Sequence, residues 1–430
     1  MRQESEVLST KSNDHNPENG RVFEVSSQPV LDDSAYYGFP GDFVKAIDPH
    51  TEADPAGILL QFLVAFGNAV GDGPYFQVEG DRHPPRENVL LVGDSSKGRK
   101  GTSWGRIRQL CDLANPVWSK RIQSGASSGE GIVFQVRDPV STIGKDGEET
   151  LIDPGEEDKR LLLLEPEFAS VLKAIERDGN TLSAILRQAW DTGDLTPLTK
   201  NIRIRATGAH ISIVGHITQM ELLKRLSETE MANGFANRFL WISVRRSKLL
   251  PNGGCFPEEE VEQFARTLQM RMNQAREIRA MHRSPDAQKL WEAAYPELGV
   301  PVLGLAGALL SRSEAHVLRL SLLYALTDGA ATVELHHMVA ALSVWNFVEA
   351  CVTRIFGTAM GDPVADKILE SLKNGPKSAT EISQIFDRNL SSTRLQKALQ
   401  FLVENHRVEC STEKTAGRNR QMFCLTKKTN

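Results

Sequence analysis

Residues 88–114 decide the fold, and they read NVLLVGDSSKGRKGTSWGRIRQLCDLA. The apolar run over 88–93 predicts a buried strand, and the pattern over 104–114 predicts a helix. A strand, a glycine-rich loop and a helix in this order suit phosphate binding, because backbone amides can wrap phosphate oxygens at a helix N-terminus. The stretch therefore predicts a phosphate site at the end of a buried strand, although a Gly/Ser/Lys-rich segment can also be a solvated turn.

The loop at 93–103 supplies the groups that such a site needs. Gly93 and Gly98 let the backbone approach phosphate, the Lys100 ammonium can meet the outer phosphates, and the Thr102 hydroxyl can bind Mg²⁺. The strict pattern would place lysine at 99 and a hydroxyl at 100, so either the loop carries an insertion or another residue takes the part of the lysine. The expected binding set is Gly93, Ser95, Ser96, Lys97, Gly98, Arg99, Lys100, Gly101, Thr102 and Ser103.

Composition points to a soluble globular protein with more than one folded unit. The chain has 430 residues, of which 40% are hydrophobic and 24% charged, and its net charge of -5 gives no chain-wide basic field. Its five cysteines are scattered and form no CxxC pair. We find no signal peptide and no apolar stretch long enough to span a bilayer. These features predict a cytoplasmic protein without membrane contact.

Four segments follow from the changes in pattern. Residues 1–36 are polar and predict a flexible leader. Residues 37–250 alternate apolar runs with amphipathic stretches, which predicts an α/β core with a mostly parallel sheet. Residues 251–360 predict an all-helical lid domain. Residues 361–430 predict three short helices and a β-hairpin around Gly417, the order of a winged helix.

Polar residues stand at the ends of the apolar runs. Glu165 ends RLLLLE and Glu167 follows it, at a place where a carboxylate can hold magnesium, and which of the two does so stays open. His216 ends ISIVGH and is either a phosphate sensor or a structural donor. Arg238 precedes FLWISV and either reaches a neighbouring subunit or caps a local carboxylate. Glu130 opens a helix, where it can act on water or only favour the helix dipole.

These stretches together resemble the P-loop ATPase modules of plasmid and phage replication proteins, which are RecA-like, akin to hexameric replicative helicases and often found beside primase domains. The resemblance covers about residues 51–357. It implies ATP and Mg²⁺ as cofactors, a homo-oligomeric ring such as a hexamer, DNA as a partner, single-stranded or duplex, and a primase or other replication protein as a further partner. The stretches that carry it are TEADPAGILLQFLVAFGNAVG, LLVGDSSKGRKGTSWGRI, SSGEGIVFQVRDP, LLLLEPEFASVL, ISIVGHIT, NGFANRFLW and HVLRLSLLYAL.

The resemblance also implies roles for single residues. Lys100 and Thr102 would bind phosphate and magnesium, with Glu165 or Glu167 assisting at the metal. Glu130 would activate the attacking water and His216 would sense the terminal phosphate. Arg238 would be the finger that completes the site of the adjacent subunit.

The last segment carries a local basic excess, with twelve Lys and Arg against eight Asp and Glu over 362–428. Such an excess suits DNA backbone contact, although winged helices also bind proteins. The expected DNA-binding residues are Arg394 and Lys397 on the second helix of the helix-turn-helix, and Lys414, Arg418 and Arg420 on the wing.

Three functions fit this sequence. The leading one is an ATP-hydrolysing DNA helicase or translocase of a mobile-element replication system. The second is an ATP-regulated DNA-binding replication initiator with little turnover. The third is a defence or regulatory ATPase whose winged helix binds a protein partner.

Overall fold

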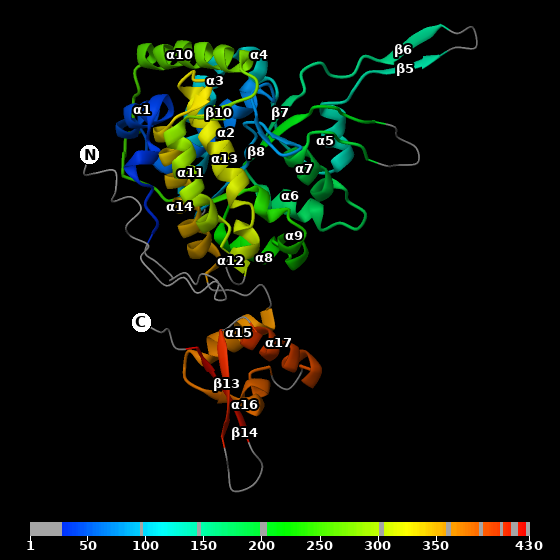
Figure 1. Cartoon of the computed structure of the whole chain (residues 1–430), viewed down its shortest axis with the longest axis vertical. Helices are drawn as coiled ribbons and strands as arrows, with labels where there is room; N and C mark the ends of the chain where they lie inside the picture. Colours follow the sequence, from blue (N-terminus) through cyan, green and yellow to red (C-terminus); the bar gives the residue numbers. More distant parts are fainter. Residues whose placement is uncertain are drawn as a thin grey trace.

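A central five-stranded sheet organises most of the chain (Figure 1). Its order is β4 (Ile122–Gln123), β7 (Arg160–Glu165), β8 (His210–Ile217), β3 (Val89–Val92) and β9 (Leu240–Ser243), and every neighbouring pair is parallel. Strands β3 and β8 are buried along their whole length, which explains the continuous apolar run of β3 and the mostly apolar sequence of β8, whose polar residues His210, Ser212 and His216 are also buried. The mixed α/β architecture and the parallel sheet predicted from these runs are confirmed.

The computed structural model describes nine stretches of the chain, and the statements below refer to them. They are 28–94, 98–143, 148–197, 204–300, 305–357, 363–386, 390–404, 407–413 and 420–426.

Helices cover both faces of the sheet. One face carries α2 (Pro55–Val70) and α3 (Lys100–Ala114), and the other carries α5 (Gly129–Gln135), α6 (Phe168–Ile175), α7 (Leu182–Asp191) and α8 (Gln219–Arg225). Successive residues of a strand point to opposite faces of the sheet, and two adjacent residues of β8 show this. The His216 ring contacts α2, whereas a side chain added at Gly215 would contact Phe168 of α6.

The helices between 251 and 360 share one apolar core with the sheet. Helices α10 (Glu258–Glu277) and α13 (Ser313–Thr327) pack against α2, and α14 (Leu335–Phe356) packs against β9. Because α13 and α14 are apolar on most of their circumference, they must be covered on several sides. The boundary expected near 250 therefore falls inside a continuous core that runs from Leu31 to Phe356.

The N-terminal boundary also lies earlier than the sequence suggested. Residues 1–27 of the expected leader lie outside the described residues, but Leu31 and Ala35 are buried in the core. The Tyr324 hydroxyl donates a hydrogen bond to the Ala35 carbonyl at 2.5 Å, which anchors the short 3-10 helix η1 (Asp33–Ala35).

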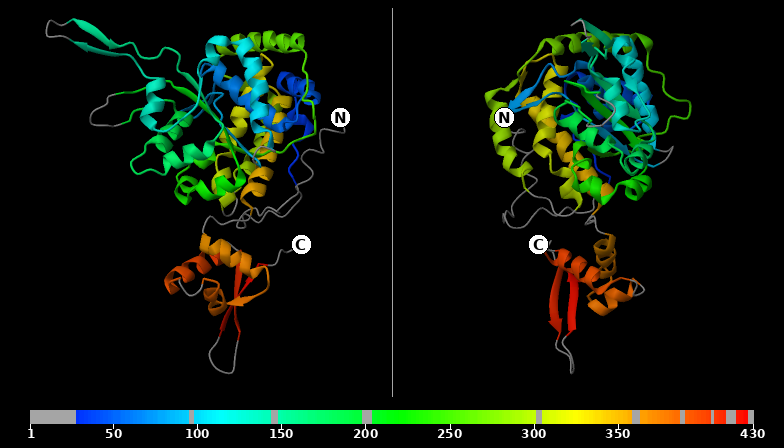
Figure 2. Two further views of the ribbon diagram at one scale, coloured as in Figure 1. Left: turned by 180° about the vertical axis from the view of Figure 1, so that it is seen from behind. Right: turned by 90° about the vertical axis from the view of Figure 1, so that its right-hand side faces the viewer.

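Residues from 363 onward form a second core of their own (Figure 2). Helices α15 (Pro363–Leu372), α16 (Ala379–Gln384) and α17 (Ser392–Glu404) pack against a small antiparallel sheet in the order β12 (Lys377–Ser378), β14 (Arg420–Leu425), β13 (Val408–Glu413). The three helices and the pair of long strands match the elements predicted from sequence, and Gly417 at the expected hairpin turn lies outside the described residues.

A two-stranded hairpin, β5 (Val140–Ile143) and β6 (Glu149–Asp153), was not predicted, and it projects from the body (Figures 1 and 2). Shorter elements complete the chain: η2 (Asp48–His50), η4 (Ala236–Arg238), α1 (Gly38–Ile47), α4 (Pro116–Ser119), α9 (Glu228–Ala232), α11 (Pro285–Leu298), α12 (Leu305–Leu310), β1 (Phe76–Val78), β2 (Asp81–His83), β10 (His282–Arg283) and β11 (Thr332–Val333).

Helix α14 corrects one sequence-based statement, because its 22 residues are long and apolar enough to cross a membrane. However, 72% of its apolar window is buried inside the fold, as in the core helix of a soluble protein. All five cysteines are free thiols.

Candidate active site

The chain connections change direction at the carboxyl ends of β3 and β8, and this place is called the crevice below. From β3 the chain crosses two strands to reach β4, whereas from β8 it runs the other way to β9. Right-handed crossovers in opposite directions put the following helices on opposite faces, and α3 indeed packs on α2 while α8 packs on α6. In open parallel sheets such a switch point is where ligands bind.

The loop after β3 separates the roles of two adjacent cations. The Lys100 ammonium returns over the loop and donates hydrogen bonds to the carbonyl oxygens of Gly93 at 2.7 Å and Asp94 at 2.9 Å. The Arg99 guanidinium turns away and pairs with the Glu52 carboxylate at 2.7 Å. Of these two described cations, Lys100 is therefore the one at the mouth of the loop, which the spacing of the sequence left open.

Gly93 is required by close backbone packing at the start of the loop. Its amide donates to the Ile217 carbonyl at 3.2 Å, which ties the loop to the end of β8. A Cβ at this position would lie 2.5 Å from the carbonyl oxygen of Val244, which follows β9. The loop thus begins wedged between its two neighbouring strands.

A buried hydrogen-bond chain connects β8 to the first turn of α3. The His216 Nε2–H donates to the Gln61 side-chain oxygen at 2.9 Å, and the Gln61 amide nitrogen donates to the Ser103 hydroxyl at 2.7 Å. The Ser103 hydroxyl in turn donates to the Lys100 carbonyl at 2.6 Å. Burial, and secondly the positive charge of Lys100, lower the pKa of His216 to about 4, so this ring is neutral near pH 7.

Two hydroxyls on α3 differ in their availability for a metal. Ser103 is buried and belongs to the hydrogen-bond chain, whereas Thr102 is exposed in the first turn. Gly101 stands directly after Lys100, and a Cβ built there meets open space. Thr102 is thus the loop hydroxyl free to meet a magnesium ion, one residue later than the strict pattern has it.

The two acids at the end of β7 have different surroundings. The Glu165 carboxylate is buried and accepts hydrogen bonds from the amides of Gly125 at 2.9 Å and Ala126 at 2.8 Å, so it holds the chain that follows β4. Burial raises its pKa. Glu167 is exposed at the start of α6 and acts electrostatically on Lys100. Of the two, Glu167 is the acid whose carboxylate is available beside the lysine.

The pKa of Lys100 reports the balance of charges at the crevice. Burial lowers it, while the negative charges of Asp94, Glu167 and Glu221 raise it. These three carboxylates, called the acidic rim below, thus contribute negative charge near Lys100, and carboxylate oxygens are ligands that Mg²⁺ prefers.

Glu130 lies in the first turn of α5, after the Ser128 N-cap. The hydroxyl of Thr181, just before α7, donates to its carboxylate at 3.0 Å. Glu130 thus joins α5 to α7 and lies where an acid favours the helix dipole of α5. A role of Glu130 in activating water stays a prediction.

Arg238 lies just before β9, at the amino ends of the strands and thus at the end of the sheet opposite to Lys100. It is 6% exposed, pairs with the Asp191 carboxylate at 2.6 Å, also bonds the Gly234 carbonyl, and lies over the Trp190 ring. Within one chain Arg238 pairs with a local carboxylate, which is the second of the two interpretations made from the sequence. Its action across a subunit interface stays a prediction.

Several predicted residues lie outside the described part of the chain. They are Ser95, Ser96, Lys97, Lys414 and Arg418.

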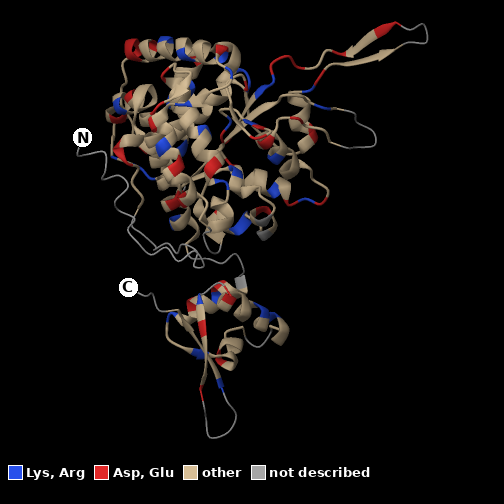
Figure 3. Cartoon of the chain, viewed as in Figure 1, with Lys and Arg blue, Asp and Glu red and all other residues tan. Residues whose placement is uncertain are grey.

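The described basic residues of the C-terminal unit are differently placed. Arg394 is partly buried and Lys397 is exposed, and these are the two basic residues of α17, where Figure 3 colours them blue. The Arg420 guanidinium pairs with the Glu381 carboxylate at 2.8 Å and donates to the Ser378 hydroxyl at 2.8 Å, so it holds the start of α16.

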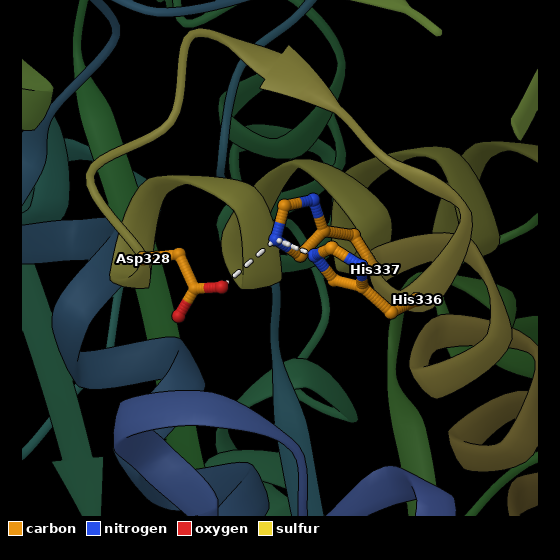
Figure 4. Close-up of side chains that lie close together, drawn as sticks. All are labelled: Asp328, His336 and His337. Atoms are coloured by element: carbon orange, nitrogen blue, oxygen red, sulfur yellow. Dashed lines mark hydrogen bonds and ion pairs between the residues drawn. The ribbon is translucent and has the colours of Figure 1, made fainter. Parts of the chain in front are cut away.

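A cluster of Asp328, His336 and His337 lies apart from the crevice, with its ligand atoms within 4.8 Å of one another (Figure 4). The Glu334 amide donates to His337 Nδ1, so the proton of this ring is on Nε2. Nε2 lies 3.1 Å from both the Asp328 carboxylate and His336 Nε2. Because its Nε2 carries the proton, His337 acts here as a hydrogen-bond donor, and the cluster does not fit a metal centre.

Sequence reasoning missed Gln61 and Glu52. Gln61 was a lone polar residue inside the apolar run at 58–66, and this pattern is the signal that could have marked a buried hydrogen-bonding role. Glu52 accepts from Arg246 and the Leu250 amide, and these bonds, Arg246 first, hold its pKa at about 2. Neither a scan against protein-family models nor a search of curated proteins finds a match for this chain.

Proposed function

We propose that the chain is an ATP-hydrolysing P-loop enzyme with a RecA-like core that binds ATP and Mg²⁺ at the crevice between β3 and β8. The observation that carries the proposal is the Lys100 ammonium held on the Gly93 and Asp94 carbonyls, above the start of α3. A triphosphate can replace these two carbonyls, because phosphate oxygens are stronger acceptors for an ammonium group.

The surrounding groups support the same chemistry. Thr102 and Glu167 supply oxygens for magnesium beside Lys100. Neutral His216 stands behind the loop, joined through Gln61 to the helix that begins at Lys100. Phosphoryl transfer needs this kind of positioning and charge neutralisation more than covalent chemistry.

The two neighbouring cations give a matched test of nucleotide binding. Lys100→Ala removes the ammonium from the loop, whereas Arg99→Ala removes a cation that pairs with Glu52. Loss of a charge-assisted hydrogen bond costs about 1.5–3 kcal/mol, or roughly tenfold to hundredfold in affinity. We expect this loss for Lys100→Ala only, measured by titration with a fluorescent ATP analogue. Equal affinities for the two variants would refute the proposed site.

The proposed partner is DNA, contacted by the C-terminal unit as a winged helix, in a ring-forming helicase or translocase of a mobile-element replication system in the cytoplasm. Exposed Lys397 on α17 supports this role. Lys397→Ala should weaken DNA binding and reduce its salt dependence by about one unit of slope. Lys373→Ala is the control, because Lys373 pairs with Glu370 on α15. An unchanged salt slope would favour a protein partner.

A second candidate is an ATP-regulated DNA-binding initiator, or a regulatory ATPase, with little turnover. The displaced hydroxyl favours it, since Gly101 and not a serine or threonine follows Lys100, and so does the engagement of Glu165 with backbone amides. Measuring ATP hydrolysis with and without single-stranded DNA separates the two. A motor is stimulated by DNA, whereas an initiator is not.

A further inference from the structure

The β5–β6 hairpin is an arm with a fixed root. At its base the Arg137 guanidinium pairs with the Asp153 carboxylate at 2.6 Å and lies over the Phe134 ring. The Asp138 carboxylate accepts from Lys159 at 2.8 Å and from the Thr207 hydroxyl at 2.7 Å. These contacts bind the root to the amino ends of β7 and β8 and set the direction in which the arm leaves the body (Figure 1).

The arm exposes apolar side chains that the body does not cover. Ile143 is 75% exposed, Leu151 is 57% exposed and Ile152 is 65% exposed. Ile143 lies opposite Glu149 and Ser141 lies opposite Leu151, so Ile143, Leu151 and Glu149 share one face of the hairpin. Glu149, the first residue of β6, is exposed and adds a carboxylate to this face. The arm therefore presents an apolar and acidic surface.

An isolated hairpin of this kind needs a partner. Two-stranded hairpins without a covered face are marginally stable in water, and the β5–β6 sheet contains these two strands alone among the described residues. A surface that covers Ile143 and Leu151 would remove this apolar area from water.

A complementary surface lies on α8 of the same chain. Met220 is 78% exposed and Leu223 is 53% exposed, and both lie on one side of the helix with exposed Lys224. Each surface thus carries two exposed apolar side chains and one exposed charge, and the charges of Lys224 and Glu149 are opposite.

The arm cannot bind α8 of its own chain, because the arm and α8 lie at opposite ends of the strands of the sheet. The arm starts beside the amino ends of β7 and β8, whereas α8 follows the carboxyl end of β8. We propose that the β5–β6 arm of one copy docks on the α8 face of a second copy. Such a head-to-tail contact uses two different surfaces, so it repeats from copy to copy and closes into a ring when the rotation allows.

The contact also reaches the proposed nucleotide site. Helix α8 is capped by Thr218, two residues after His216, and the Glu221 carboxylate acts on Lys100. An arm seated on α8 thus touches the element that carries part of the acidic rim. This link to turnover rests on the proposed function, whereas the assembly itself does not.

Paired variants test the assembly by analytical ultracentrifugation. The arm variant is Ile143→Ser with Leu151→Ser, the α8 variant is Met220→Ser with Leu223→Ser, and Leu249→Ser is the control at an exposed leucine outside both surfaces. We expect wild type and control to self-associate and each double variant to associate roughly a hundredfold more weakly, about tenfold for each apolar side chain. Thermal melts check that the variants fold.

Mixing the two double variants provides the decisive test. The arm variant keeps an intact α8, and the α8 variant keeps an intact arm, so an equal mixture should form one-to-one dimers that do not extend further. Glu149→Lys and Lys224→Glu should each weaken assembly and together restore it. A monomeric wild type, an arm variant that assembles normally, or a mixture that stays monomeric would overturn the proposal.

A nucleotide-site variant keeps this test apart from the proposed function. Lys100→Ala should assemble like wild type without nucleotide, because Lys100 lies in neither surface. Assembly without ATP binding would refute the ATPase proposal alone. ATP binding by a wild type that does not assemble would refute the arm and the ring-forming part of the proposed function, but not the nucleotide site.

Discussion

Gln61→Met tests the buried chain that joins His216 to the phosphate loop. Methionine keeps the volume of glutamine but removes the acceptor of the His216 Nε2–H and the donor to Ser103. The Ser103 hydroxyl keeps its bond to the Lys100 carbonyl, so one orphaned group remains, on a ring that is 3% exposed. An unsatisfied buried donor costs about 1–3 kcal/mol, and we expect this loss in the free energy of urea unfolding.

A double-mutant cycle separates this cost from general damage to the core. His216→Leu alone orphans the Gln61 side-chain oxygen and should cost a similar amount. Removing both partners leaves neither orphan, so Gln61→Met with His216→Leu should be less destabilising than the sum of the single variants by about 1–2 kcal/mol. Additive losses would refute the reasoning, because they would mean that the two side chains do not depend on each other.

Two further predictions concern the same crevice. Gly101→Ser places a hydroxyl directly after Lys100, in open space, and should raise magnesium-dependent ATP turnover; a steady-state assay that shows no gain would mean that Thr102 already fills this role. The pKa of His216 falls from 6.5 to about 4 on folding, so the unfolded chain binds more protons between these values and stability must fall as the pH is lowered through this window, by about 3 kcal/mol. Other buried histidines act with the same sign, so the difference between wild type and His216→Gln isolates this contribution, and equal pH slopes of unfolding would contradict it.

The parallel sheet and its helices could be predicted because buried strands leave apolar runs in the sequence. The four leucines at 161–164 and the mostly apolar residues 211–215 form runs that have to be covered on both faces. The boundary near 250 was not readable, because the same apolar character of α13 and α14 fits a separate helical domain and a shared core equally well. Only the contacts of α14 with β9 decide between the two.

The β5–β6 arm escaped prediction because its strands are not buried. Val140–Ile143 and Glu149–Asp153 are short and lie outside any core, so they lack the pattern that marks core strands. The prediction of single residues at the crevice was limited for another reason. The sequence identified Lys100 and the acids after β7, but the direction in which Arg99, Glu165 and Glu167 point depends on partners distant in the chain, such as Glu52.

Arg238 presents a conflict that variants can resolve. Its guanidinium is buried and pairs with Asp191, which is 36% exposed. Removing Asp191 leaves the buried Arg238 guanidinium without a carboxylate and should cost about 2–3 kcal/mol of stability, whereas removing Arg238 leaves Asp191 with its longer ion pair to Arg312 at 3.5 Å and should cost less. A loss of turnover in Arg238→Ala would therefore say little by itself, because a damaged fold has the same effect.

Arg238→Ala combined with Asp191→Ala removes both charges and so separates the structural role of the arginine from a catalytic one. The double variant should recover most of the stability that Asp191→Ala loses, measured by urea unfolding. If Arg238 completes the site of a neighbouring copy, ATP turnover in the assembled protein stays low in the double variant although stability returns, because no other group replaces the charge at the transferring phosphate. Turnover that returns together with stability would leave Arg238 with a structural role alone.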